Sequence, residues 1–142
     1  MNFYIYSFLF VLSLNGVIAA TNSSKGALSR YQVWVVSALP SGTDPLFLHC
    51  WSSDDDLGTH FLPPGPHGFH WHFRENISQS TKFKCEFVWI NKNIAFYVFD
   101  KHLSGKCKGR GGICYWLVME TAFYFANYIN PFPKDLELMY SW

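Results

Sequence analysis

The feature that most constrains this chain is an alternation of large apolar side chains with mostly charged ones between residues 81 and 89. Phe83, Cys85, Phe87 and Trp89 fall on one face, and Lys82, Lys84 and Glu86 fall on the other. Successive side chains of a β-strand point to opposite faces, whereas a helix would spread this apolar set around its circumference. The segment is therefore predicted to be a strand with one buried face.

The same period of two recurs elsewhere along the chain. Apolar residues share one face in two further segments, with Val33, Val35 and Leu39 in the first and Phe69, Trp71 and Phe73 in the second. Strands are also predicted over 46–51, 94–100, 115–120 and 123–125, because turn-forming Gly, Pro, Asn and Asp separate these runs. Residues 101–112 are predicted to be a long polar loop, and 134–140 has weak helical potential. The chain has 142 residues, enough for one domain, and is rich in aromatic residues, which favour strands. We predict an all-β fold, a small antiparallel β-sandwich of seven to eight strands.

Residues 1–20 form a different kind of segment. No charged residue occurs from Phe3 to Ala20, residues 8–12 are strongly apolar, and Ala19 and Ala20 close the run. This pattern is typical of a signal peptide, although the positive charge before the apolar run comes from the amino terminus alone. An uncleaved membrane anchor is the alternative, but Asn15 and Gly16 interrupt the stretch. We predict a signal peptide over 1–20 and a single secreted domain over 21–142, without stable membrane insertion.

The four cysteines are interpreted in the light of this leader. Cys50, Cys85, Cys107 and Cys114 are even in number, and an exported chain reaches an oxidising compartment. Zinc is the alternative, but no Cys-x-x-Cys pair is present. Two disulfides are therefore predicted. Three pairings are possible, and of these we favour Cys50 with Cys114 and Cys85 with Cys107.

The chain contains two N-glycosylation sequons, which become acceptor sites if the chain enters the secretory pathway. They begin at Asn76 and at Asn22. Asn76 is the stronger candidate, because Asn22 lies close to the predicted cleavage point.

Two charged segments are candidates for partner contact. Asp54, Asp55 and Asp56 are adjacent, which differs from the spaced acids of a calcium loop, so an acidic turn is expected there. Lys106, Lys108 and Arg110 lie in the Gly-rich segment after residue 100, which is either a solvated connector or a contact surface. Loops on a rigid framework commonly carry binding residues.

The histidines are weighed as metal ligands or catalytic groups. His70 and His72 share a strand face with each other, and His67 is near them, but that face is opposite the apolar one and is expected to face solvent. His60 follows the acidic turn closely enough for an acid–base pair, and His49 with His102 could be proposed for a ribonuclease. No motif supports either reading, so we expect no catalytic residue, no metal and no cofactor. A net charge of +1 gives no drive toward nucleic acid.

Taken together, these segments resemble a known family. The matching runs, in order, are 48–50, 54–60, Gly65, 69–73, Asn76, 83–89, 96–100, Cys107 and 114–118. This series is similar to the plant self-incompatibility protein family, the S-protein homologues, over about residues 31–125. Ser37 and Ala122 depart from the usual family residues, and the segment from Lys101 to Gly112 is unusually Gly-rich and basic.

The resemblance implies a small secreted plant β-sandwich with two disulfides, acting as a ligand. Founding members are stigma proteins recognised by a pollen-surface partner, so the expected partner is a cell-surface protein receptor and the expected state is a monomer. The alternative function is a secreted defence-type protein, possibly hydrolytic, that acts on other cells or their walls.

Overall fold

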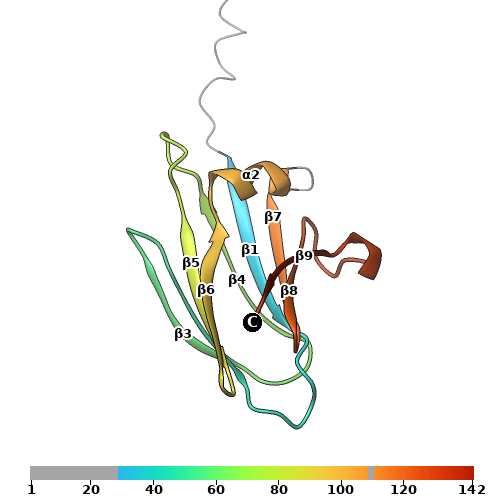
Figure 1. The fold of residues 1–142 in the computed structure, drawn as a ribbon. Coiled ribbons are helices and arrows are strands. Elements are labelled where there is room, and N and C mark those ends of the chain that lie inside the picture. The colour runs from blue at the N-terminus through green and yellow to red at the C-terminus, as the bar shows by residue number, and fades with distance from the viewer. Residues whose placement is uncertain (1–28, 109–110) are drawn as a thin grey trace, which may run out of the picture.

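The computed structural model describes residues 29–108 and 111–142, in which nine strands form two stacked sheets (Figure 1). The predicted signal peptide, Asn22 and Arg110 lie outside the described residues. The first five strands are β1 (Arg30–Ser37), β2 (Leu46–Trp51), β3 (Asp56–Leu62), β4 (His67–Arg74) and β5 (Phe83–Trp89). The others are β6 (Lys92–Phe99), β7 (Ile113–Val118), β8 (Ala122–Ala126) and β9 (Glu137–Ser141), with a helix α2 (Lys101–Cys107) and a 3-10 turn η2 (Pro133–Asp135).

The strands divide into a five-stranded and a four-stranded sheet. The first sheet has the order β4-β1-β7-β8-β9, and the second has the order β3-β2-β5-β6. All described pairs are antiparallel except β1 with β7, which run parallel. The prediction of an all-β sandwich is confirmed, with one more strand than the expected range.

The core is built from the alternation that the sequence displays. In β5, Phe83, Cys85, Phe87 and Trp89 are all buried, while the residues between them are partly exposed. Facing rings from the other sheet complete the interior: Phe87 lies 4.9 Å from Phe123 between ring centroids. Burial of such rings supplies much of the stability of a sandwich, at about 1.5–3 kcal/mol for each large apolar side chain.

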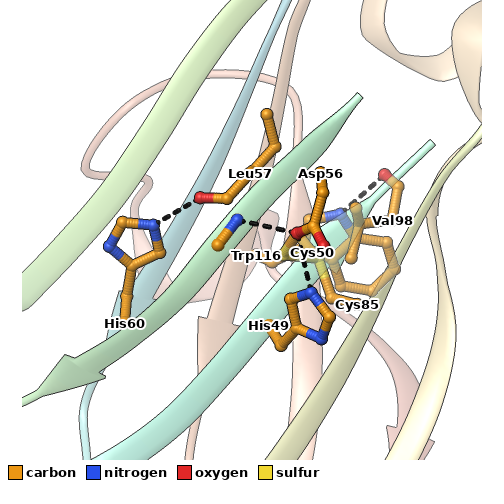
Figure 2. The surroundings of a disulfide bond; sticks show 9 residues. His49, Cys50, Asp56, Leu57, His60, Cys85, Val98 and Trp116 are labelled. Atoms are coloured by element: carbon orange, nitrogen blue, oxygen red, sulfur yellow. Dashed lines mark hydrogen bonds and ion pairs between the residues drawn. A yellow bond between two sulfur atoms is a disulfide. The ribbon is translucent and has the colours of Figure 1, made fainter. Parts of the chain in front are cut away.

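The predicted disulfide pairing is wrong. The bridges join Cys50 to Cys85 and Cys107 to Cys114. Cys50 and Cys85 are direct partners across neighbouring strands β2 and β5, with Cα atoms 4.1 Å apart (Figure 2). Cys114 lies in the other sheet. Cys107 ends α2, and a short connection brings it to Cys114 in β7. The prediction failed because strand neighbours are not evident from spacing alone.

The predicted polar loop after residue 100 is partly helical. Asp100 caps α2, and its Oδ1 accepts a hydrogen bond from the backbone N–H of Leu103 at 2.8 Å. Leu103 and Cys107, four residues apart, are buried beneath the helix. Interior packing and the cap therefore outweigh the low helix propensity of Gly105.

Two other expectations differ from the structure. Residues 134–140 were expected to have helical potential, but η2 and strand β9 occupy this region, and β9 pairs with β8. The acidic turn is shorter than expected, because Asp56 already belongs to β3 and pairs with Trp51. No helix in residues 29–108 and 111–142 is long and apolar enough to cross a membrane.

Candidate recognition surface

Several connections gather at one end of the sandwich, which we call the loop end. Strands β2, β4 and β6 all finish there, so residues 52–55, residues 75–82 and α2 lie where β1 begins (Figure 1). Contacts between the sheets fix this alignment: the Tyr31 and Phe99 rings lie 4.8 Å apart, and the Phe73 and Phe83 rings lie 4.7 Å apart. The two charged segments singled out from the sequence therefore share one end of the molecule.

The acidic turn is shaped by Ser52. Its Oγ accepts hydrogen bonds from the backbone N–H groups of Asp54 and Asp55, at 3.3 and 3.0 Å, and its own N–H donates to the Asp55 carbonyl at 2.7 Å. These bonds use the backbone of the turn and leave the carboxylates of Asp54 and Asp55 exposed to solvent. Both residues also line a hollow of about 130 Å³ together with Asn76.

Asp56 has a structural task rather than a free carboxylate. Its Oδ1 accepts a 2.9 Å hydrogen bond from the backbone N–H of Gly58 and lies 2.8 Å from Nε2 of His49 (Figure 2). The Gly58 hydrogen bond first, and then His49, lower the pKa of Asp56 below its ordinary value. The sequence analysis did not predict that His49 is the partner of Asp56. The two residues are only seven positions apart and lie on the neighbouring strands β2 and β3, which would have pointed to this contact.

The basic segment is divided by its packing. Lys106 Nζ lies 3.0 Å from both carboxylate oxygens of Glu137, so this lysine ties α2 to β9. Lys101, His102 and Lys108 are exposed. Of the predicted contact residues Lys106, Lys108 and Arg110, Arg110 lies outside the described residues. Within residues 29–108 and 111–142, Lys108 is exposed and has no carboxylate partner.

Asn76 is exposed in the connection between β4 and β5. Its Nδ2 donates to Ser80 Oγ at 2.9 Å, and its Oδ1 accepts from the Ser80 N–H at 2.8 Å. The sequon therefore lies on an ordered turn at the loop end.

The histidines are distributed among separate contacts. His70 stacks flat on Trp34, with centroids 3.9 Å apart, on the outer face of the first sheet, as the alternation predicted. His60 does not meet the acidic turn: its Nε2 lies 2.9 Å from the Leu57 carbonyl oxygen (Figure 2). Its ring stacks on Phe69. Within residues 29–108 and 111–142, no group of three potential ligands could hold a metal.

Residues 32–142 match the family model described as plant self-incompatibility protein S1. The chain belongs to this family. The match begins in β1 and includes β9, so it extends beyond the 31–125 range of the sequence resemblance.

Curated members of the family give the same assignment. S-protein homolog 29 of Arabidopsis thaliana is 33% identical over 97 residues, which cover 68% of this chain and 67% of that protein. S-protein homolog 1 of the same plant is 35% identical over 102 residues, which cover 70% of this chain and 65% of that protein. The chain thus spans about two thirds of the length of these two relatives.

A solved structure has the same fold as this chain. It belongs to the SPH (self-incompatibility protein homologue) proteins, described as a widespread family of small, highly stable, secreted proteins from plants. The TM-score is 0.56 over 74% of this chain and 90% of that chain, at 16% identity. At this identity the likeness concerns the sandwich alone.

Proposed function

We propose that this family member is a secreted ligand that binds a protein on the surface of another cell, in recognition of the self-incompatibility type. The observation that carries the proposal is the loop end, where exposed charges of both signs project from a framework fixed by two disulfides. Asp54 and Asp55 supply the negative charge, and Lys101 and Lys108 supply the positive charge.

Extracellular action is supported by three independent features. Residues 1–20 have the pattern of a signal peptide, and all four cysteines are bridged, as suits an oxidising compartment. A protein of the same fold is described as secreted. These features favour a partner outside the cell that produces the protein.

Binding is favoured over catalysis by how the histidines near the acidic turn are used. His49 is paired with Asp56, and His60 contacts a backbone carbonyl and the Phe69 ring. Both histidines thus have structural partners. A rigid framework with short connections suits binding, because little conformational entropy is lost when the partner docks.

The expected role of the loop-end charges is to steer association. Exposed charges at an interface act mainly on the association rate, and added salt screens them. Because Lys106 is tied to Glu137, its replacement would disturb β9 as well as the charge. Lys101 and Lys108 are therefore the cleaner positions for a test.

The test is a kinetic measurement of the labelled, oxidised protein on intact pollen and protoplasts of the plant that makes it. The double variants Asp54→Asn/Asp55→Asn and Lys101→Gln/Lys108→Gln should associate more slowly at low salt and melt at the wild-type temperature. Glu120→Gln, in the exposed β7–β8 turn at the opposite end, is the matched control and should change neither. Unaltered association by both double variants, or an equal loss in the control, would contradict the proposal.

A further inference from the structure

A groove of about 360 Å³ lies on the outer face of the four-stranded sheet, next to the loop end. Trp51, Lys82, Lys84 and Tyr97 line it, and Ser52, Ser53 and Ser80 complete the lining. Its volume is within the range of roughly 300–1,000 Å³ that is usual for sites of small molecules.

The register of three strands creates the groove. Trp51 of β2 pairs with Lys84 of β5, and Lys84 pairs with Tyr97 of β6. Neighbouring strands are about 4.7–4.9 Å apart, so the two aromatic residues flank the lysine in one row. Cys50, Cys85 and Phe96, at adjacent positions of the same strands, are buried, so this row faces outward.

Two ammonium groups share the same aromatic ring. Lys84 Nζ lies 5.5 Å and Lys82 Nζ lies 5.6 Å from the Tyr97 centroid. Neither lysine has a carboxylate within ion-pair distance in residues 29–108 and 111–142, where the ion pairs are those of His49 and Lys106. Both ammonium groups are positively charged and lack a carboxylate partner, so a ligand with negative charge would be attracted by both.

We propose that this groove binds an acidic oligosaccharide, a chain of sugar rings that carry carboxylates. The apolar faces of the sugar rings would lie on Trp51 and Tyr97, and the carboxylates would accept charge-assisted hydrogen bonds from Lys82 and Lys84. Ser80 Oγ is already hydrogen-bonded to Asn76 Nδ2 and Ser78 Oγ, so the two lysines supply the polar contacts of the proposed complex. The groove shares Ser52, Ser53, Ser80 and Lys82 with the segments of the loop end, but its two lysines are different residues from the charges assigned to the proposed receptor contact.

The charge pattern favours a saccharide over a single-stranded nucleic acid. Proteins that bind single strands combine stacking rings with a groove that is positive along the whole backbone. Here the net charge of the chain is +1, and the row ends at Asp56, the partner of Trp51 in β3. A ligand with separated carboxylates matches two lysines better than a continuous run of phosphates does.

The test is calorimetric titration of the secreted, oxidised protein with a short galacturonic acid oligomer. Its fully methyl-esterified form has the same rings without charge, and a short single-stranded DNA is the competing ligand class. The acidic oligomer should bind saturably, and the ester should bind about tenfold more weakly, because it lacks the charged acceptors. Equal affinity for the ester, tighter binding of the DNA, or no heat of binding with the acidic oligomer would overturn the proposal.

Variants locate the binding to the groove. Lys84→Gln and Tyr97→Ala should each weaken binding of the acidic oligomer about five- to tenfold, the loss expected for one charged or stacking contact. Tyr97 is 42% exposed, so its removal should leave the fold intact, which thermal unfolding checks. Lys101→Gln, an exposed lysine of α2 outside the groove, is the control and should bind as the wild type does. Wild-type affinity of Lys84→Gln would refute the site while leaving the receptor proposal untouched.

Discussion

Removal of each disulfide in turn gives a quantitative test of the fold. The bridge Cys50–Cys85 closes a loop with a sequence separation of 35, whereas Cys107–Cys114 closes one with a separation of 7. In the chain-entropy model, these loops restrict the unfolded chain by about 3.8 and about 2.4 kcal/mol at room temperature. All four cysteines are fully buried, so replacing either pair by alanine removes similar apolar contacts. The loop lengths therefore predict a difference of about 1.4 kcal/mol between the two double variants.

The assay is equilibrium unfolding in urea under non-reducing conditions. Cys50→Ala/Cys85→Ala should lower the free energy of unfolding more than Cys107→Ala/Cys114→Ala does. An equal or larger loss for the second pair would refute the reasoning from loop length. A peptide map of the unreduced protein provides the companion measurement, and recovery of a Cys50–Cys114 peptide would refute the pairing itself.

Three further predictions concern single residues. Trp89→Ala should lower the free energy of unfolding by about 3–5 kcal/mol, because the ring is buried and its Nε1 donates to the Asp44 carbonyl. Lys84→Ala, on the outer face of β5, should cost only about 0.5–1 kcal/mol. An equal loss for both variants in urea unfolding would contradict the β5 register. Ile90→Asn should raise the free energy of unfolding by about 1 kcal/mol, because this exposed β-branched residue has φ +57° in the β5–β6 turn and asparagine adopts that conformation more readily. A melting temperature below that of the wild type would contradict this prediction. Asp56→Asn should destabilise the protein at neutral pH, because the lowered pKa of Asp56 means that its carboxylate stabilises the fold above pH 3.8. The difference in melting temperature between variant and wild type should shrink as the pH falls below 3.8. A difference that does not change with pH would argue against the His49 and Gly58 contacts.

The strands could be predicted from the sequence where one face is apolar and the other is polar. Segment 81–89 shows this alternation, and the structure contains β5 at Phe83–Trp89. Segment 46–51 was predicted as a strand from the turn residues around it, and β2 has these bounds. β3 is harder, because its residues are mostly exposed and Gly58 interrupts the pattern. β9 was also not apparent, since its side chains are mostly exposed and its main support is pairing with β8.

The helix α2 carried a signal that composition concealed. Asp100 stands at the N-cap position, and Leu103 and Cys107 have the four-residue spacing of one helix face. Gly105 and the glycines that follow made the whole segment resemble a loop. A capping residue followed by apolar residues at this spacing would have been the better guide.

Contacts between distant segments could not be predicted from the sequence alone. Lys106 and Glu137 are 31 positions apart, and no local pattern links them. The pairing of Cys50 with Cys85 and the row of Trp51, Lys84 and Tyr97 depend on which strands are neighbours. Strand order is decided by packing of the whole sandwich, so these parts of the candidate sites required the structure.

The central claim is that the loop end determines which partner is bound. It is tested most directly by moving segments 52–55 and 101–108 of this chain into the Arabidopsis S-protein homolog 29, with Cys107 retained. Binding of the chimera to intact pollen and protoplasts is then compared with that of both parents. The chimera should bind the cells recognised by this chain, with similar association kinetics. Binding that follows the recipient framework, in a chimera that melts as its parents do, would contradict it.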